Sequence, residues 1–141
     1  MGILVLMAAS CQTAARSEAA LPSGPPVLVV TLDEYRFDYA QPVPAGRVVF
    51  RLLNVGTVSH RPVLLPLDED VPPIQEQLRG DQRRAASPFA QVLSRPPGST
   101  GTFAVDLVAG QRYAWICFAR DADGSPHALK GMASEFRAGG S

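Results

Sequence analysis

Short apolar runs interrupted by turn residues dominate this sequence, and this alternation restricts the fold more than any other feature. The 141 residues include 13 Pro and 12 Gly, which end helices and favour tight turns. β-Branched and aromatic residues fill the intervening runs, as expected for short strands. We expect strands at residues 27–32, 35–39, 47–54, 60–65, 102–107, 112–118 and 132–137. About seven short strands at regular spacing predict an all-β sandwich.

The length and the charge set further limits. A chain of 141 residues can bury one sizeable core, and we assign residues 27–138 to a single domain. Within the polar connection 67–95, residues 73–84 can hold one short helix. Lys and Arg number 13, as do Asp and Glu, so the composition lacks the basic excess typical of nucleic-acid binding.

The first residues resemble a secretion signal. Residues 1–10 (MGILVLMAAS) form an apolar run much shorter than the roughly 20 residues that a transmembrane helix needs. Small residues precede Cys11, as in bacterial lipoproteins, where this Cys is lipidated and becomes the N-terminus. Residues 11–26 would then be a lipidated tether at the periplasmic or extracellular face of the cell envelope. The alternative is an ordinary apolar leader in which Cys11 is incidental, because no Lys or Arg precedes the run.

Four residues in the domain form a possible metal site. Nine residues separate Cys117 from His127, and four more separate His127 from Met132, so one loop between two strands holds all three. His60 lies near the start of an earlier strand. Two His, one Cys and a weak axial Met are the ligands of a blue copper centre, because Cu(I) favours sulfur and Cu(II) accepts imidazole.

Each of these four residues also has a simpler interpretation. Cys117 is equally at home in a core, Met132 can fill one, His127 can be a surface residue, and His60 can cap a turn. Taken together they favour a metal site, because both His of the chain and the only Cys and Met of the domain are used.

Residues 43–60 (VPAGRVVFRLLNVGTVSH), 110–118 (GQRYAWICF) and 126–132 (PHALKGM) resemble the signature regions of the cupredoxins, and of bacterial cupredoxin-like lipoproteins in particular. The resemblance implies a Greek-key β-sandwich with one mononuclear type 1 copper bound by His60, Cys117, His127 and Met132. It also implies that both histidines bind through Nδ1. The loop 118–126 is longer than in plastocyanin-like members, and Arg61 replaces an Asn that commonly braces the site.

The same resemblance implies how the site exchanges electrons. The ring edge of His127 would reach the surface as the electron port, within an apolar rim of Pro126, Ala128 and Leu129. Tyr113 and Trp115 lie on the strand face of Cys117 by the period of two, and their bulk should keep water from the sulfur. Residues 121–125 (DADGS) lack the Gly and Glu positions of an EF-hand, so we interpret them as a solvated turn.

We therefore expect a monomeric electron carrier, not an enzyme, that transfers one electron at the outer face of a bacterial membrane to a transient protein partner. Mixed charges around the port argue against strong electrostatic steering. Two alternatives remain open, namely copper capture or delivery and a metal-free cupredoxin-like binding module. Delivery ranks lower because copper carriers tend to expose several Met or His residues.

Overall fold

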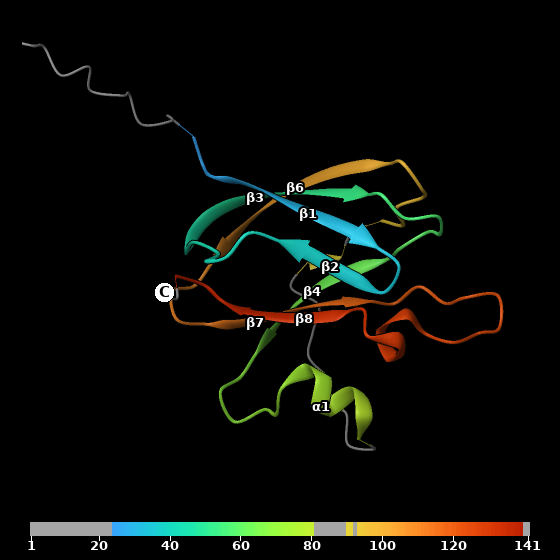
Figure 1. Cartoon of the computed structure of the whole chain (residues 1–141). Helices are drawn as coiled ribbons and strands as arrows, with labels where there is room; N and C mark the ends of the chain where they lie inside the picture. Colours follow the sequence, from blue (N-terminus) through green and yellow to red (C-terminus); the bar gives the residue numbers. More distant parts are fainter. Residues whose placement is uncertain (1–23, 81–89, 92, 140–141) are drawn as a thin grey trace, which may run out of the picture.

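The computed structural model describes residues 24–80, 90–91 and 93–139, which fold into two stacked four-stranded sheets (Figure 1). The first sheet has the order β2 (Arg36–Tyr39), β1 (Val27–Asp33), β3 (Gly46–Asn54) and β6 (Thr100–Leu107). The second has the order β5 (Ala90–Gln91), β4 (Pro62–Leu67), β7 (Arg112–Cys117) and β8 (Ala133–Arg137). One α-helix, α1 (Ile74–Arg79), and one 3₁₀ helix, η1 (His127–Lys130), complete the described part. The predicted β-sandwich with one short helix in a long connection is confirmed.

Strand pairing fixes the positions from which the candidate ligands project. β1 and β3 run parallel, whereas β4 pairs antiparallel with β7, and β7 with β8. The β4–β7 register places Pro62 directly opposite Cys117. Proline has no N–H to give to the ladder, which suits its place as the first residue of the strand.

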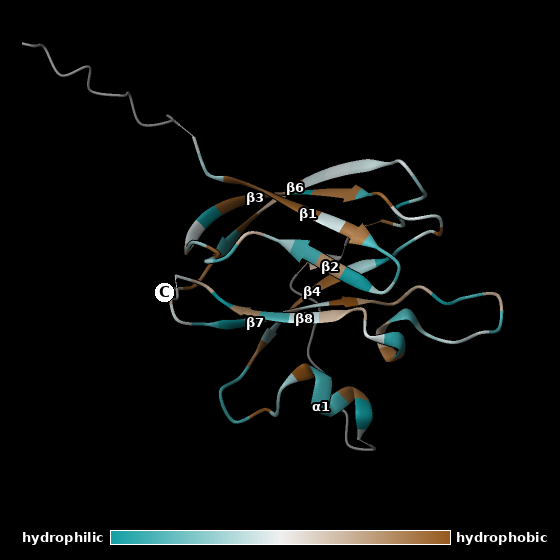
Figure 2. Ribbon diagram, in the orientation of Figure 1, coloured by the Kyte–Doolittle hydropathy of each residue, from teal (hydrophilic) through white to brown (hydrophobic). Residues whose placement is uncertain are grey.

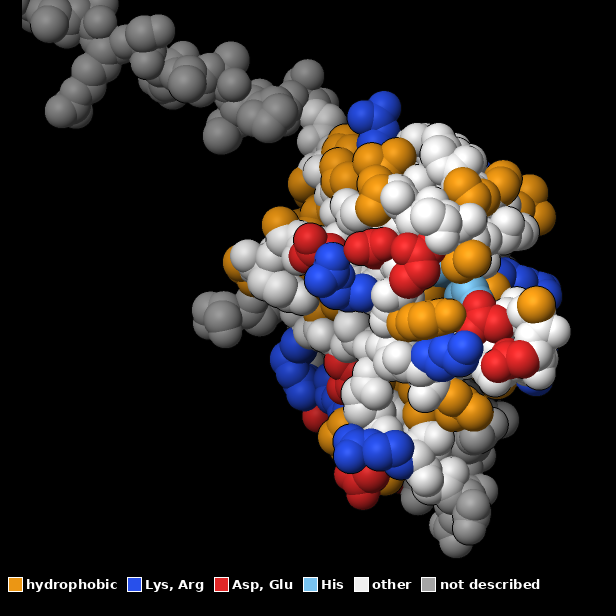
Figure 3. All heavy atoms as spheres, turned by 45° about the vertical axis from the view of Figure 1, so that its right-hand side comes forward, with side chains coloured by type: hydrophobic (Ala, Val, Ile, Leu, Met, Phe, Trp, Pro, Cys, Tyr) orange, Lys and Arg blue, Asp and Glu red, His pale blue; other side chains and the backbone are white. Residues whose placement is uncertain are grey.

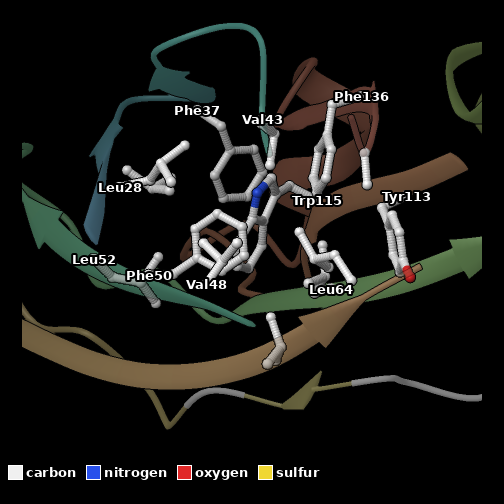
Figure 4. Packing of buried hydrophobic residues seen from close by; sticks show 14 of the residues in the cluster. Leu28, Phe37, Val43, Val48, Phe50, Leu52, Leu64, Tyr113, Trp115 and Phe136 are labelled. Atoms are coloured by element: carbon white, nitrogen blue, oxygen red, sulfur yellow. The ribbon is translucent and has the colours of Figure 1, made fainter. Parts of the chain in front are cut away.

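The main core lies between the two sheets and is built on aromatic side chains. Trp115 of β7 is fully buried at its centre, with Phe37 stacked on one side and Phe50 packed edge-on (Figure 4). Tyr113, Cys117 and Met132 belong to the same buried cluster. Side chains at every second position of β7 thus enter this core, which confirms the predicted shared face of Tyr113, Trp115 and Cys117.

A second, smaller core covers the outer face of the β5–β4–β7–β8 sheet. Ala114 and Ile116 of β7 point into it, together with Ile74 of α1 and Ala128 of η1. Because both faces of β4 and β7 are covered, these strands are nearly continuous hydrophobic runs rather than alternating ones. Figure 2 shows the contrast with the loop that follows β7, which is largely hydrophilic.

Most strand bounds agree within two residues, and four differences bear on the site or its sheet. The strand predicted at 60–65 begins at Pro62, so His60 lies before it and forms only an isolated bridge to Arg95. β8 begins at Ala133, one residue after Met132. The two-residue strand β5 and the helix η1 were not predicted; both are too short to produce a periodic pattern.

The predicted signal peptide (1–10), Cys11 and residues 12–23 of the tether lie outside the described residues. The first strand begins at Val27, as expected. Within the described part of the chain, no helix has the length and apolar character needed to cross a membrane.

Candidate metal centre

Cys117 is held at the end of β7 by backbone contacts on both sides. Its own N–H donates to the carbonyl of Met132 at 3.1 Å. On the other side, the backbone N–H of Arg61 donates to Sγ at 3.3 Å. The Arg61 backbone therefore performs a bracing role for which its side chain is not needed.

The loop after Cys117 folds back on itself, and this return brings His127 to the sulfur despite the length of the loop. The Asp121 N–H donates to the Ser125 carbonyl at 3.0 Å, and Gly124 turns the chain with a φ of +82°. The His127 N–H then donates to the Ala119 carbonyl at 2.9 Å. Because residues 121–125 form a closed turn, the chain returns to the start of the loop, and His127 lies beside Ala119.

Met132 reaches the centre through the tight turn of η1. Gly131 ends this helix in the left-handed region, with a φ of +107°. The Met132 N–H donates to the His127 carbonyl at 3.0 Å, and the Met132 side chain is fully buried in the cluster that includes Cys117. The backbone thus ties Met132 to two of the other candidate ligands.

His60 comes from the β3–β4 connection, where two side chains shape the backbone. The buried Asn54 amide donates to the carbonyls of Val58 and Arg95 at 2.8 and 2.7 Å, and its Oδ1 accepts from Gly56 N–H. His60 and Arg95 exchange a pair of backbone hydrogen bonds of 3.0 and 2.7 Å. His60 is therefore fixed by the main chain of two segments far apart in sequence.

Glu34, in the turn between β1 and β2, supports the same connection from the other side. One carboxylate oxygen accepts from the backbone N–H groups of Thr57 and Val58 and from the Thr57 hydroxyl. The hydrogen bonds, led by that from the Thr57 backbone, lower the pKa of Glu34 to about 2. A carboxylate held in this way stays ionised well below neutral pH.

The donor atoms of His60, Cys117 and His127 form a compact triangle. Nδ1 of His60 lies 3.2 Å from Nδ1 of His127, and Cys117 Sγ lies 3.9 and 3.6 Å from these two atoms. A point equidistant from all three lies about 2.1 Å from each, close to typical metal–nitrogen and metal–sulfur bond lengths of about 2.0–2.3 Å. All three side chains are buried. The donor set and its spacing thus fit one transition-metal ion.

The surroundings set the protonation of these donors. Burial lowers the pKa of His60, and the nearby His127 lowers it further, so His60 is neutral at neutral pH and has a lone pair to offer. Burial raises the pKa of the Cys117 thiol, although the N–H groups of Arg61 and Ala119 oppose this shift. His60 Nε2 and Trp115 Nε1 have no hydrogen-bond partner among the described residues.

One expectation about the loop is wrong, and the solvated turn expected at residues 121–125 is present but incomplete as a description. The ring of His127 is only 1% exposed rather than open at its edge, because Asp121 and Tyr35 lie against it. Asp121 is not part of a merely solvated turn. Its Oδ1 lies 3.1 Å from His127 Nε2, and its Oδ2 accepts from the Tyr35 hydroxyl at 2.8 Å and from the Lys130 ammonium.

The sequence reasoning missed the side chains that hold the ligands. Asn54 lies in residues 43–60, which resemble a cupredoxin signature region. Its position at the end of the predicted strand was the signal that could have identified it as a support. Glu34 and Tyr35 gave no such signal, since their partners lie far away in sequence. Figure 3 shows the resulting surface, where a small area of histidine is surrounded by acidic, basic and hydrophobic side chains.

Comparison with solved structures identifies this architecture. The chain is similar to auracyanin from the photosynthetic bacterium Roseiflexus castenholzii, with a TM-score of 0.55 and 17% identity over 83% of this chain and 98% of that one. It is similar to auracyanin A, a "blue" copper protein from Chloroflexus aurantiacus, with a TM-score of 0.54 and 20% identity over 82% and 99% of the chains. Rusticyanin from Thiobacillus ferrooxidans gives a TM-score of 0.54 and 17% identity over 82% and 79%.

No protein-family model and no curated protein matches the sequence. The structural likeness, at this low identity, concerns the fold. The chain has the cupredoxin fold, with a buried His60–Cys117–His127 cluster at one end of its second sheet.

Proposed function

We propose that this protein is a type 1 copper protein that carries single electrons, and that His60, Cys117, His127 and Met132 would hold the copper. The observation that carries the proposal is the triangle of two imidazole nitrogens and one sulfur around a common point about 2.1 Å away. This donor set is the one that blue copper centres use. The similar auracyanin A, described as a "blue" copper protein, supports the choice of metal.

Copper would supply the one-electron cycle between Cu(II) and Cu(I), and the protein would supply a rigid site that suits both states. Cys117 would bind as a thiolate, so that its buried thiol releases a proton when metal enters. The Arg61 N–H would then donate to the sulfur and stabilise its negative charge. The Trp115 and Tyr113 rings in the adjoining core would keep water from the sulfur.

Burial of the centre favours electron transfer over catalysis. His60, Cys117 and His127 are all buried, so a substrate would meet no exposed ligand. Electrons, by contrast, can pass through the side chains that cover the site. Phe118, next to Cys117 in the chain, is 52% exposed, and Leu129 of η1 is 49% exposed. We propose that these two residues offer the apolar contact for a transient redox protein.

The charges near this contact are mixed. Asp121 and Asp123 lie beside Lys130, and Arg120 donates to the Gly124 carbonyl in the same loop. Association with the partner should therefore depend only weakly on ionic strength. We propose that the protein acts as a monomer.

The proposed location rests on the sequence alone. The apolar residues 1–10 and the small residues before Cys11 support secretion and lipid anchoring at the outer face of a bacterial membrane, with residues 11–26 as the tether. Expressed in a bacterium, the protein should partition into detergent, and its Cys11→Ser variant should not. A mature form that keeps residues 1–10 would refute this location.

Addition of Cu(II) to the purified protein tests the copper proposal. One equivalent should produce an intense visible thiolate-to-copper band that a one-electron reductant bleaches and an oxidant restores. Cys117→Ser should abolish the band, whereas Cys11→Ser is the matched control and should keep it. A colourless protein with no tight Cu(II) binding would refute the proposal. Rapid loss of copper to a chelating acceptor would favour delivery instead.

A further inference from the structure

The carboxylate of Asp121 connects the buried His127 ring to the surface. Oδ1 lies 3.1 Å from His127 Nε2, on the side of the ring opposite to the donor triangle. Oδ2 accepts from the Tyr35 hydroxyl at 2.8 Å and from Lys130. Both oxygens therefore have partners, and the side chain, 16% exposed, is fixed in one orientation.

The contact with Asp121 determines which nitrogen of His127 carries the proton. An ionised carboxylate only accepts hydrogen bonds, so His127 Nε2 must be the N–H donor. The other nitrogen, Nδ1, is then left with its lone pair directed at His60 Nδ1 and Cys117 Sγ. His127 is thus held in the tautomer that a metal ion requires at Nδ1.

His60 has no comparable partner. Its Nδ1 lies 3.2 Å from the bare Nδ1 of His127, so a hydrogen bond between these two atoms in the metal-free protein requires His60 Nδ1 to be the donor. Its Nε2 then carries the lone pair, and this atom has no hydrogen-bond partner among the described residues. Metal binding at His60 Nδ1 requires the proton to move to Nε2, whereas His127 needs no such change.

Further contacts hold Asp121 itself in place. The Tyr35 ring packs edge-on against His127, with centroids 5.2 Å apart, while its hydroxyl donates to Asp121. The Lys130 ammonium lies 5.1 Å from the centroid of the same Tyr35 ring. Tyr35 and Lys130 come from different elements, and both converge on one carboxylate.

We propose that Asp121 is a positioning residue that holds His127 in its Nδ1-donating tautomer and lowers the reduction potential of the copper centre. A carboxylate behind a ligating imidazole raises the basicity of the ligand, which stabilises the higher-charged metal state. The claim about the reduction potential rests on the copper function proposed above. The claim about the tautomer does not, since it applies to the metal-free protein as well.

The tautomer is tested on the metal-free wild-type protein at neutral pH by long-range ¹H–¹⁵N NMR correlation of the imidazole nitrogens. The result expected is a protonated Nε2 and a bare Nδ1 at His127, with the reverse at His60. A protonated Nδ1 at His127 would overturn the positioning role. This NMR measurement needs no variant and no copper, so it determines the tautomer of His127 even if the protein does not bind copper.

The effect on the metal is tested by comparing Asp121→Asn with Asp123→Asn. Both remove one negative charge from the same loop, but the Asp123 side chain is 65% exposed and accepts its hydrogen bond from the Ser125 N–H rather than from His127. Asp121→Asn should weaken Cu(II) binding by about 10–100-fold, and Asp123→Asn by less than about threefold.

The reduction potential separates positioning from simple loss of fold. Each tenfold loss of Cu(II) affinity relative to Cu(I) raises the potential by about 59 mV, so Asp121→Asn should have a clearly higher potential than Asp123→Asn. Equal potentials and equal affinities in the two variants would overturn the proposal. Failure of the wild type to bind copper would refute the proposed function and the claim about the potential, while the NMR result would stand by itself.

Discussion

His60 and His127 sit 3.2 Å apart at Nδ1, and main-chain hydrogen bonds position both, but only the His127 ring has a side-chain support as well. His60 is fixed through its main chain, which bonds twice to Arg95, while its own Nε2 lacks a partner in the described structure. His127 has main-chain hydrogen bonds to Ala119 and Met132, and its ring is held in addition by Asp121 at Nε2 and by the edge-on Tyr35. The comparison shows that backbone and side-chain supports can position equivalent donors in a single site.

The two means of support have different consequences. The His60 support depends on a buried amide and on hydrogen bonds deep in the fold, so damage to it should cost stability. The His127 support lies in a partly exposed loop, so damage to it should alter the metal site more than the fold.

Removal of either imidazole should have the same result if both are ligands. His60→Ala and His127→Ala should each abolish the visible band of the Cu(II) protein, because a trigonal site cannot form from two donors. Visible absorption and EPR after addition of one equivalent of Cu(II) test this. A band that survives in one variant would show that its histidine is not a ligand.

Asn54→Ala tests the support of His60. The substitution removes three hydrogen bonds of a buried amide, and at about 0.5–1.5 kcal/mol each it should lower the free energy of unfolding by about 2–4 kcal/mol. Urea denaturation of the metal-free protein measures this change. Asn54→Asp is the matched variant: it keeps the acceptor for Gly56 but sets a carboxylate against two carbonyl oxygens, and should be no more stable than Asn54→Ala. An unchanged midpoint in both variants would refute the role of Asn54.

Glu34→Gln tests the second support of the His60 connection through the pH dependence of stability. The pKa of Glu34 is lowered to about 2 in the folded protein, from 4.5. Its stabilising contribution is therefore complete above about pH 4.5 and is lost as the pH falls towards 2. The variant should lose less stability than the wild type over this range, as measured by thermal unfolding at several pH values. Parallel curves would contradict this account.

Tyr35→Phe should give the smallest effect and applies to the His127 side. The change removes one hydrogen bond to Asp121 but keeps the ring against His127. Cu(II) affinity should fall by less than about tenfold, and by less than in Asp121→Asn. Stability at neutral pH should remain near that of the wild type. A loss larger than that of Asp121→Asn would assign the main positioning role to Tyr35.

The sequence predicted the strands that carry the site but not the side chains that support it. The period of two placed Tyr113, Trp115 and Cys117 on one buried face, because that alternation is local information. The association of His60 with the later loop also agreed with the structure, since strand pairing brings β4 beside β7.

The supports were harder to predict because each depends on a contact between distant segments. Asp121 lies in a stretch of turn-forming residues, and its role depends on Tyr35, which is 86 positions away. The expected exposure of His127 was wrong for the same reason. Local sequence gave no sign that the loop would fold back and place a carboxylate and a tyrosine over the ring.

X-ray absorption at the copper edge of the loaded wild-type protein tests the central claim most directly. The account predicts one sulfur and two imidazole nitrogens at about 2.0–2.3 Å in the oxidised protein, with little change on reduction. A copper shell of nitrogen and oxygen only, without a short sulfur contact, would contradict a centre built on His60, Cys117 and His127.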